Sequence, residues 1–323
     1  LFIDGFKFRL AGDWAPEDRK AHILGLDCVT IFNLEGPVWL GSSLEKESAL
    51  SLSPKAGPSI LNTTLPNLKC GSVAVCSNNH FFDFGLDGYL SSIDALNAFG
   101  LRHVGSGLSK DEAKAPLILQ IGGNRVGLLA RCETQFGVAD NENPGVAGYD
   151  ATIYEQIRSL KNEVDVVVVS VHAGAEMLPW PSPARQDAWR ALIEAGADIV
   201  HGHHAHVPQG WEEYKGGYIF YGCGNLCVDP AKWSWHPNAL WSITPEITLE
   251  HGCFTVDIKT MFINVHGDLI NICDESDEGF RKHADYLKIC NSPLSNRPLL
   301  EGLWQEASMR LYRNHYSDWL GFD

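Results

Sequence analysis

The chain has 323 residues, of which 45% are hydrophobic and 20% are charged, so it is long enough for a sizeable core and has the composition of a globular protein. Its formal net charge of -15 repels nucleic acid and anionic membranes, which excludes both as expected partners. No apolar run approaches the roughly 20 residues that a membrane-spanning helix needs.

The predicted elements alternate between strands and helices, which is typical of an α/β protein. In chain order, strands are predicted over 6–11, 28–32, 72–76, 117–121, 125–130, 164–170, 197–200 and 218–221, with a hairpin over 252–273. Helices are predicted over 16–24, 86–99, 153–161 and 183–195 and through most of 276–319. A long loop is expected over 38–57. We expect one catalytic domain over 1–275 and a helical extension, 276–323, packed on it.

Side chains of metal-ligand type follow successive predicted strands at their carboxyl ends. They are, in chain order, Asp13, Glu35, Asn79 with His80, His172, and His204 with His206. In α/β sheets this edge is where ligands bind. A single Asp or Asn after a strand is usually a turn residue, but a series of such strand ends favours a metal site.

Residues 201–206 read His-Gly-His-His-Ala-His and follow the apolar run 197–200. Neutral imidazole is the commonest ligand for zinc, iron, nickel and manganese. His204 and His206 share a face of an extended strand, and in a tight loop both can turn toward one centre. A surface cluster of histidines is the alternative interpretation. It is the weaker one, because the other strand ends supply matching ligands.

The segment 229–241 holds three tryptophans, among them Trp233 and Trp235, without a clear period. Two interpretations stay open. The rings pack in the core, or they stack against a sugar ring or another flat face of a substrate. Trp14 and Trp180 are candidates for the same rim of the site.

Six spaced motifs occur in order along residues 7–227. They are Gly12-Asp13, Asn33-Leu34-Glu35-Gly36, Asn78-Asn79-His80-x-x-Asp83-x-Gly85, His172-x-Gly174-x-Glu176, Gly202-x-His204-x-His206-Val207-x-Gln209 and Tyr221-x-x-Gly224-Asn225. In these motifs the chain resembles the CapA family of poly-γ-glutamate capsule proteins, a branch of the calcineurin-like metallophosphoesterases. The resemblance implies an α/β fold of the four-layer αββα sandwich type, with a two-metal site at the strand ends.

The resemblance also implies a role for each motif. The implied ligands are Asp13 and His206 for a first divalent ion, Asn79, His172 and His204 for a second, and Glu35 for both. Manganese, iron and zinc suit such a mixed set of carboxylate, amide and imidazole ligands. His80, with Asp83 close by, would contact the substrate or protonate its leaving group.

Two positions depart from the pattern of the wider superfamily. Ala15 stands where an Asp-x-His motif would have its histidine, so one ligand is absent or comes from elsewhere. Glu35 stands where the bridging residue would be Asp, and its side chain is longer by one methylene. Both departures bear on whether the site holds two ions or one.

The predicted function is hydrolysis of a phosphoester by a metal-dependent enzyme related to capsule and exopolymer biosynthesis proteins. The alternatives are a hydrolase or transferase acting on glutamyl or amide bonds of a capsule-type polymer, and a non-hydrolytic accessory protein of polymer assembly. The substrate is expected to be an anionic small molecule or polymer end, which bound cations would attract. Residues expected on the substrate side are Asn33, Glu176, His203, Asn225, Trp233 and Trp235.

The cysteines bear on the compartment. Nine of them, without Cys-x-x-Cys spacing, indicate buried free thiols and slightly favour the cytoplasm. The chain begins with Leu1, and the family resemblance also allows an exported or anchored form whose leader is missing from this sequence.

Overall fold

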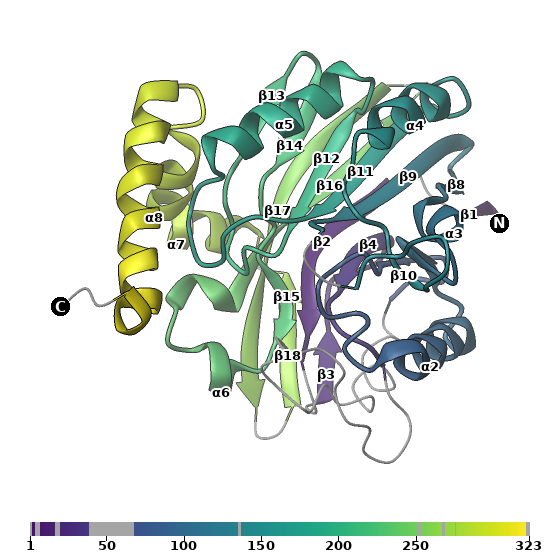
Figure 1. Ribbon diagram of the computed structural model, residues 1–323, viewed down its shortest axis with the longest axis horizontal. Coiled ribbons are helices and arrows are strands. Elements are labelled where there is room, and N and C mark those ends of the chain that lie inside the picture. The colour runs from purple at the N-terminus through teal and green to yellow at the C-terminus, as the bar shows by residue number, and fades with distance from the viewer. Residues whose placement is uncertain are drawn as a thin grey trace.

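The computed structural model describes residues 2–3, 7–16, 20–38, 68–134, 137–250, 253–266, 269–274 and 276–320. Two β-sheets lie face to face at the centre, and helices cover their outer faces (Figure 1). Most of the loop predicted over 38–57 lies outside the described residues.

The seven-stranded sheet contains the strands that lead into His172 and into the histidine cluster. Its order is β1 (Phe2–Ile3), β8 (Leu117–Ile121), β9 (Asn124–Cys132), β11 (Val166–His172), β12 (Ile199–His203), β14 (Gly217–Phe220) and β13 (Trp211–Tyr214). β9, β11, β12 and β14 are parallel neighbours. β11 is buried along its whole length, as its run of valines predicts for a strand covered on both faces.

The nine-stranded sheet contains the strands that lead into Asp13 and Glu35. Its order is β3 (Lys20–Ile23), β18 (Leu269–Asp274), β17 (Cys253–His266), β16 (Trp241–Glu250), β2 (Lys7–Ala15), β4 (Val29–Leu34), β5 (Val73–Val75) and β6 (Arg102–Val104), with β15 (Asn225–Val228) paired to β2. β2, β4, β5 and β6 run parallel, so their carboxyl ends share one edge. A separate antiparallel pair joins β7 (Ser106–Gly107) and β10 (Gly145–Val146).

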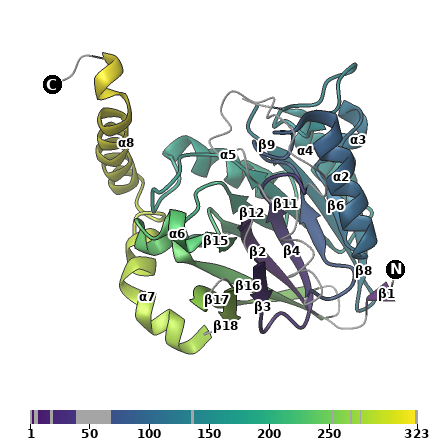
Figure 2. The ribbon, with the colours of Figure 1, turned by 90° about the horizontal axis from the view of Figure 1, so that it is seen from below.

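Three apolar clusters hold the layers together. One lies between the sheets and includes Ile31 from the nine-stranded sheet and Val168 from the seven-stranded sheet. Helices α4 (Thr152–Lys161) and α5 (Pro183–Glu194) pack on the outer face of the seven-stranded sheet, and α2 (Gly85–Ala98) packs on the outer face of the other (Figure 2). The result is a four-layer αββα sandwich, so the predicted fold class is confirmed.

The local signals that start α5 illustrate how the sequence forms these helices. Ser182 precedes the helix, and its hydroxyl accepts the backbone N–H of Arg185. Pro183 occupies the first turn, where its missing N–H costs no hydrogen bond. The short helices are α3 (Lys110–Lys114), α6 (Pro230–Trp233) and the 3-10 helix Pro237–Leu240.

The sequence-based assignment was wrong at two places near the amino terminus. The helix predicted over 16–24 is not formed at Lys20–Ile23, which is strand β3, parallel to β18. Ala21 and Ile23, two apart, are both buried in the adjacent core, and this alternation is the period of a strand. Trp14, considered for the rim of the site, is 2% exposed and packs edge-on against Phe32 in the core.

The tail is mostly helical, as predicted, and it forms two helices, α7 (Ser276–Asn291) and α8 (Arg297–Leu320). α7 packs against β17, and the Tyr286 hydroxyl donates to the carbonyl of Pro208. Trp180, the other candidate for the rim, donates its indole N–H to the carbonyl of Ile289 in α7. The domain division at residue 275 stays a prediction. Among the described residues, no helix combines the length and apolar character needed to cross a membrane.

Candidate metal centre

Strand ends from both sheets bring five side chains to one place between them. Asp13 lies near the end of β2, Glu35 follows β4, His172 ends β11, and His204 and His206 follow β12. β2 is parallel to β4 and β11 is parallel to β12, so the carboxyl ends of each pair meet at the same edge. All five residues are at most 7% exposed. The structure thus brings these five side chains together, and their roles as metal ligands stay a prediction.

A β-bulge in β2 aims Asp13 into the space between the sheets. Between the positions where Leu10 and Asp13 pair with β4, strand β2 has one residue more than its partner. The extra residue reverses the alternation of side chains, so Asp13 faces inward as Leu10 does. Gly12 makes the bulge possible, because a Cβ atom there would lie 1.8 Å from the carbonyl oxygen of Gly224.

The two histidines after β12 lie in a tight left-handed turn. The φ angles of His204 and His206 are 82° and 57°, a region that residues other than glycine seldom adopt. Such conformations cost free energy and concentrate at functional sites. Here the turn brings the His204 ring to 4.6 Å from the ring of His172, between centroids.

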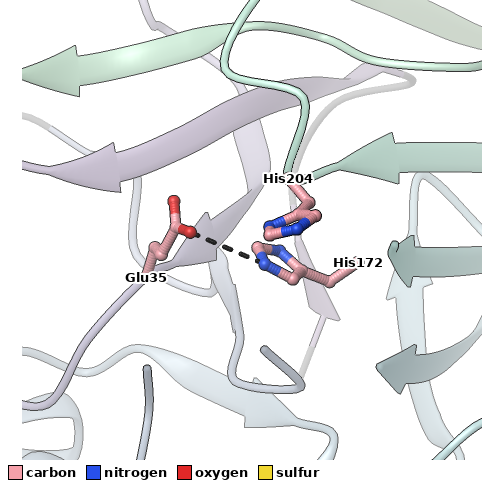
Figure 3. Close-up of side chains that lie close together, drawn as sticks. All are labelled: Glu35, His172 and His204. Atoms are coloured by element: carbon pink, nitrogen blue, oxygen red, sulfur yellow. Dashed lines mark ion pairs between the residues drawn. The ribbon is translucent and has the colours of Figure 1, made fainter. Parts of the chain in front are cut away.

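Two groups of potential ligands share the carboxylate of Glu35. In the first group, Glu35 Oε1 lies 3.5 Å from His206 Nε2, and Asp13 Oδ2 lies 3.5 Å from His206 Nδ1. In the second group, Glu35 Oε1 lies 3.5 Å from His172 Nε2, with His204 beside it (Figure 3). The arrangement therefore offers two adjacent positions for a cation with one carboxylate between them.

Asn79 joins the second group from the loop after β5. Its side-chain oxygen lies 2.7 Å from His172 Nε2. An amide oxygen next to an imidazole nitrogen is a ligand pair that manganese, iron and zinc accept. The two side chains are hydrogen-bonded to each other, and the role of Asn79 as a metal ligand stays a prediction.

Apart from the hydrogen-bonded pair of Asn79 and His172, the candidate ligand atoms fit a metal ion better than they fit one another. Within the described part of the chain, both oxygens of Glu35 and Nδ1 of His204 are buried and have no hydrogen-bond partner. A separation of 3.5 Å is too long for a good hydrogen bond. The 3.5 Å between Glu35 Oε1 and Nε2 of His172 or of His206 suits two ligands of one ion, since metal–ligand bonds of roughly 2.0–2.2 Å put neighbouring ligand atoms about 3 to 3.6 Å apart. The residues present therefore fit divalent cations.

The pKa shifts within the cluster also favour a bound cation. Burial raises the pKa of Glu35 well above its usual 4.5, and the nearby charge of Asp13 adds to the shift. Burial and the neighbouring imidazoles lower the pKa of His172 well below 6.5 and that of His204 to about 3. The two imidazoles are therefore neutral, which is the form that binds a metal. A bound cation would relieve the cost of keeping Glu35 ionised in this buried site.

Asn225, expected on the substrate side, instead lies buried behind His206. Its side-chain NH₂ donates to the carbonyls of His206 and Ala239, so its oxygen is the atom that faces His206 Nδ1, at 2.9 Å. The oxygen accepts the Nδ1–H, and this leaves Nε2 of His206 free toward Glu35. Metal-binding histidines commonly have such an acceptor on the nitrogen away from the ion.

Asn33 and His203, also expected on the substrate side, are buried too. The NH₂ group of Asn33 lies 3.0 Å from Asp13 Oδ1 and 3.2 Å from His172 Nδ1. His203 is 1% exposed, and its Nδ1 lies 3.1 Å from the same Asp13 oxygen. Both residues contact candidate ligands from the protein side and are enclosed away from solvent.

His80 and Asp83 form a pair at the accessible side of the site. His80 Nδ1 lies 3.0 Å from Asp83 Oδ2, and the His80 side chain is 32% exposed. Burial lowers the pKa of His80, but the hydrogen bond with Asp83 and the charge of Glu35 raise it more, so the net shift is upward. The pair thus combines a partly exposed imidazole with a raised pKa and a carboxylate that orients it.

The two tryptophans singled out from the sequence occupy different environments. The Trp233 ring lies 4.6 Å from the His206 ring, between centroids, and is partly buried. Trp235 is 67% exposed. Glu176 is exposed as well, and its carboxylate lies 4.0 Å from His204 Nε2. Trp233 and Glu176 thus border the metal-ligand cluster, whereas the ring contact of Trp235 is with His236.

Glu133 is a member of the site that the sequence analysis missed. It follows β9, the neighbour of β11, and its Oε1 lies 3.7 Å from His204 Nε2, while its Oε2 accepts the backbone N–H of Gly174. Burial raises its pKa. The signal was available, because Glu133 is an acidic residue at a strand end. The strand predicted over 125–130 ended two residues before the observed end of β9, so Glu133 was not recognised as a residue at a strand end.

Comparisons with known proteins found a matching family model and several relatives. The family model described as "Bacterial capsule synthesis protein PGA_cap" matches residues 12–230. The chain is 32% identical over 191 residues to the capsule biosynthesis protein CapA of Bacillus anthracis, a match covering 57% of this chain and 43% of that protein. It is 35% identical over 157 residues to the PGA biosynthesis protein CapA of Bacillus subtilis (strain 168), covering 47% and 41%.

A probable polyglutamine synthesis accessory protein of Mycobacterium tuberculosis is 32% identical over 171 residues, covering 49% of this chain and 45% of that protein. The matched part of the chain thus spans less than half the length of these curated relatives. Among solved structures, a phosphatase of Mycoplasma pneumoniae aligns with a TM-score of 0.44 and 12% identity, covering 88% of this chain and 99% of that one.

Proposed function

Because the chain belongs to the bacterial capsule synthesis protein PGA_cap family, whose model matches residues 12–230, we propose that it is a metal-dependent hydrolase of phosphoester bonds within capsule or exopolymer biosynthesis. The observation that carries the proposal is the Glu35 carboxylate. It is buried, has no hydrogen-bond partner among the described residues, and belongs to both ligand groups. A buried carboxylate of this kind is costly unless cations bind it.

The residues divide into two sets of ligands around Glu35. Asp13, Glu35 and His206 would hold a first divalent ion, and Glu35, Asn79, His172 and His204 a second. Manganese, iron or zinc suits these ligands. The first set has fewer ligands than the second, because Ala15 supplies no side-chain ligand. We therefore expect the first ion to bind more weakly than the second.

Two such ions would polarise phosphoryl oxygens and lower the pKa of a shared water. The chain's own contribution is to position the substrate and to supply a proton. His80 lies on the exposed side, and Asp83 holds its Nδ1, so its Nε2–H can reach a leaving-group oxygen. When cations neutralise Glu35, Asp83 remains as the group that keeps His80 protonated.

The substrate side is formed by Trp233, Trp235 and Glu176, together with Glu133 at its edge. The exposed ring of Trp235 is available to stack on a flat face of the substrate. Asn33, His203 and Asn225 are buried against candidate ligands, so we assign them to the support of those ligands. The substrate is an anionic small molecule or polymer end that the cations attract.

A second candidate is hydrolysis or transfer at a glutamyl or amide bond. It is favoured by the relatives described as a PGA biosynthesis protein and a polyglutamine synthesis accessory protein. Paired cations polarise a carbonyl oxygen as well as a phosphoryl oxygen. The same ligands serve either reaction, so the substrate screen must distinguish them.

The test is a screen of chelator-stripped protein to which Mn²⁺, Zn²⁺ or Fe²⁺ is restored. Bis-p-nitrophenyl phosphate, p-nitrophenyl phosphate and γ-glutamyl-p-nitroanilide all release coloured products, so one assay compares the three bonds. We expect metal-dependent cleavage of a phosphoester, lost in Glu35→Ala and retained in His103→Ala, whose imidazole lies on β6 away from the cluster. Cleavage of the anilide alone would favour the second candidate. A wild-type protein that binds no metal would overturn both.

A further inference from the structure

A chain of buried polar groups runs between the two sheets and ends on Asp13. His203 Nδ1 lies 3.1 Å from Asp13 Oδ1, and His203 Nε2 lies 2.9 Å from the Ser170 hydroxyl. The same hydroxyl lies 3.5 Å from His201 Nδ1, and His201 Nε2 lies 3.1 Å from the carbonyl oxygen of Ala11. Each of the five residues is at most 1% exposed. Buried polar groups of this number are costly in a core unless they are well paired.

Strand alternation explains how these side chains meet. His201 and His203 are two apart on β12, so both point toward the other sheet, as does Ser170 on the neighbouring strand β11. Ala11 lies in the bulged stretch of β2, which belongs to the opposite sheet. The polar chain therefore connects the two sheets immediately behind the candidate metal ligands.

The carbonyl of Ala11 sets the direction of the hydrogen bonds. A carbonyl only accepts, so His201 Nε2 carries a hydrogen, and the Nδ1 of a neutral His201 is an acceptor. Ser170 has one hydrogen to donate and lies much closer to His203 Nε2 than to His201 Nδ1. With Nε2 of His203 accepting, the hydrogen of that ring is on Nδ1 and faces Asp13 Oδ1. The opposite arrangement would set two acceptors 3.1 Å apart.

The two oxygens of Asp13 are consequently unequal. Oδ1 accepts a hydrogen bond from the NH₂ group of Asn33, at 3.0 Å, and lies 3.1 Å from His203 Nδ1. Among the residues that the structure describes, Oδ2 accepts a hydrogen bond from the backbone N–H of His204 alone, at 3.2 Å, and it is the oxygen that lies 3.5 Å from His206 Nδ1. One oxygen is saturated by the protein, and the other is left for the cation position shared with His206 and Glu35.

We propose that His203, oriented through Ser170 and His201, is a positioning residue that holds Asp13 Oδ1 and so presents Oδ2 alone to the first metal ion. This role rests on the first cation position of the proposed function. It also compensates in part for Ala15, because an ion with few ligands depends more on the correct orientation of those it has. His203 itself touches neither the ion nor the substrate.

Two substitutions at the same position separate this role from simple packing. In His203→Asn the amide nitrogen takes the place of Nδ1 and keeps the contact with Asp13. In His203→Gln the amide takes the place of Nε2 and keeps the contact with Ser170 only. Both remove the ring and leave a side chain of smaller, similar size, so a packing defect would affect them alike.

The measurement is calorimetric binding of Mn²⁺ alone to chelator-stripped protein, with the unfolding midpoint of each variant as the control for folding. We expect two sites in the wild type and in His203→Asn, with affinities within about threefold. His203→Gln should lose roughly 10–100-fold in affinity at one site and keep the other, as for other residues that support a metal ligand. With a phosphoester substrate, only His203→Gln should require more Mn²⁺ to reach the maximal kcat.

Each other result is decisive. If both variants resemble the wild type, or both lose the same site equally, the positioning role is overturned while the metal site stands. If the wild type binds no Mn²⁺, both the proposed function and this inference fail. Should both variants unfold, Ser170→Ala takes their place, since it removes the group that orients His203. About tenfold weaker binding of one Mn²⁺ in that variant would support the inference, and unchanged binding would overturn it.

Discussion

The acidic side chains near the two ends of strand β2 have different kinds of ion-pair partner. Near its start, Arg9 is 3% exposed and binds Glu246 of the neighbouring strand β16 at 2.9 Å, and Lys7 binds the other oxygen of Glu246 at 2.8 Å. Near its end, Asp13 and Glu35 have only imidazoles as ion-pair partners in the described part of the chain. The carboxylate of the first group is neutralised by Lys7 and Arg9, and the carboxylates of the second group have no lysine or arginine partner among the described residues.

The pKa values of the two glutamates express this difference. Burial raises the pKa of both, but the hydrogen bonds from Lys7 and Arg9 lower that of Glu246 more, to a net value below 4.5. For Glu35, burial and the charge of Asp13 raise the pKa more than the charge of His80 lowers it, so its pKa lies well above 4.5. A buried acidic side chain that is paired with a cationic side chain thus indicates a structural ion pair. A buried acidic side chain without such a pair indicates a site that binds a cation.

The most severe test of the comparison removes a ligand at the unneutralised end. In His204→Ala the second cation position loses one of its imidazoles, so we expect Mn²⁺ affinity to fall by more than the 10–100-fold typical of a supporting residue, and activity with it. Unfolding of the chelated protein should change little, because the cluster contributes no net stability without metal. The matched variant His103→Ala should keep metal and activity. Equal metal content in the two variants would show that the cluster binds no ion.

The next effect concerns the proton donor at the edge of the same site. His80→Asn should keep both metal ions and lose roughly 10²–10⁴-fold in rate, most strongly for poor leaving groups. Because Asp83 raises the pKa of His80 above its usual value, the wild-type rate should fall as pH rises through that pKa. In Asp83→Asn the fall should begin at a lower pH. Loss of metal in proportion to activity would instead make His80 a ligand.

At the neutralised end, removal of one partner should affect stability alone. Glu246→Ala leaves Arg9 buried without its carboxylate, and we expect the free energy of unfolding in urea to fall by about 3 kcal/mol. Mn²⁺ affinity should be unchanged. The control is Glu194→Ala, which breaks an exposed ion pair with Lys215 and should leave stability as it is. A fall in Mn²⁺ affinity with Glu246→Ala would mean that the two ends are coupled.

The smallest expected effect is also the most specific. Glu246 and Glu35 should make the free energy of unfolding change with pH in opposite directions. For Glu246, whose folded pKa is lowered, stability is present above pH 4.5 and is lost as pH falls through the folded pKa. For Glu35, whose folded pKa is raised, stability of the chelated protein is present below pH 4.5 and is lost as pH rises through the folded value.

A tenfold difference in proton affinity between the folded and unfolded states is worth about 1.4 kcal/mol, so the slope is measurable in urea titrations at several pH values. Glu35→Gln should abolish the loss above pH 4.5 and make the chelated protein more stable than the wild type at neutral pH. Saturating Mn²⁺ should remove that advantage. A Glu35→Gln variant no more stable than chelated wild type at neutral pH would contradict the assignment.

Several features followed directly from the order of residues. The valine run Val166–Val169 predicts a strand, and the helical period over 86–99 predicts a helix. Both elements are confirmed. They could be predicted because the signals lie within the elements themselves. The polar residues after these strands could be recognised as a group, because parallel strands bring their carboxyl ends to one edge. The same reasoning overlooked Glu133, since the predicted strand before it was too short.

Tertiary structure alone decided which side of the site each residue occupies. No local sequence pattern indicates the bulge that turns Asp13 inward, because the extra residue is defined only by the pairing of β2 with β4. Asn33, His203 and Asn225 were expected beside the substrate, and they lie behind the ligands because the second sheet closes over them. Residues 20–23 form a strand instead of a helix because β18, far along the chain, offers an edge to pair with. Sequence determined which chemical groups reach the strand ends. The packing of the two sheets determined which of them face a cation and which hold the others in place, since that depends on contacts between residues far apart in the chain.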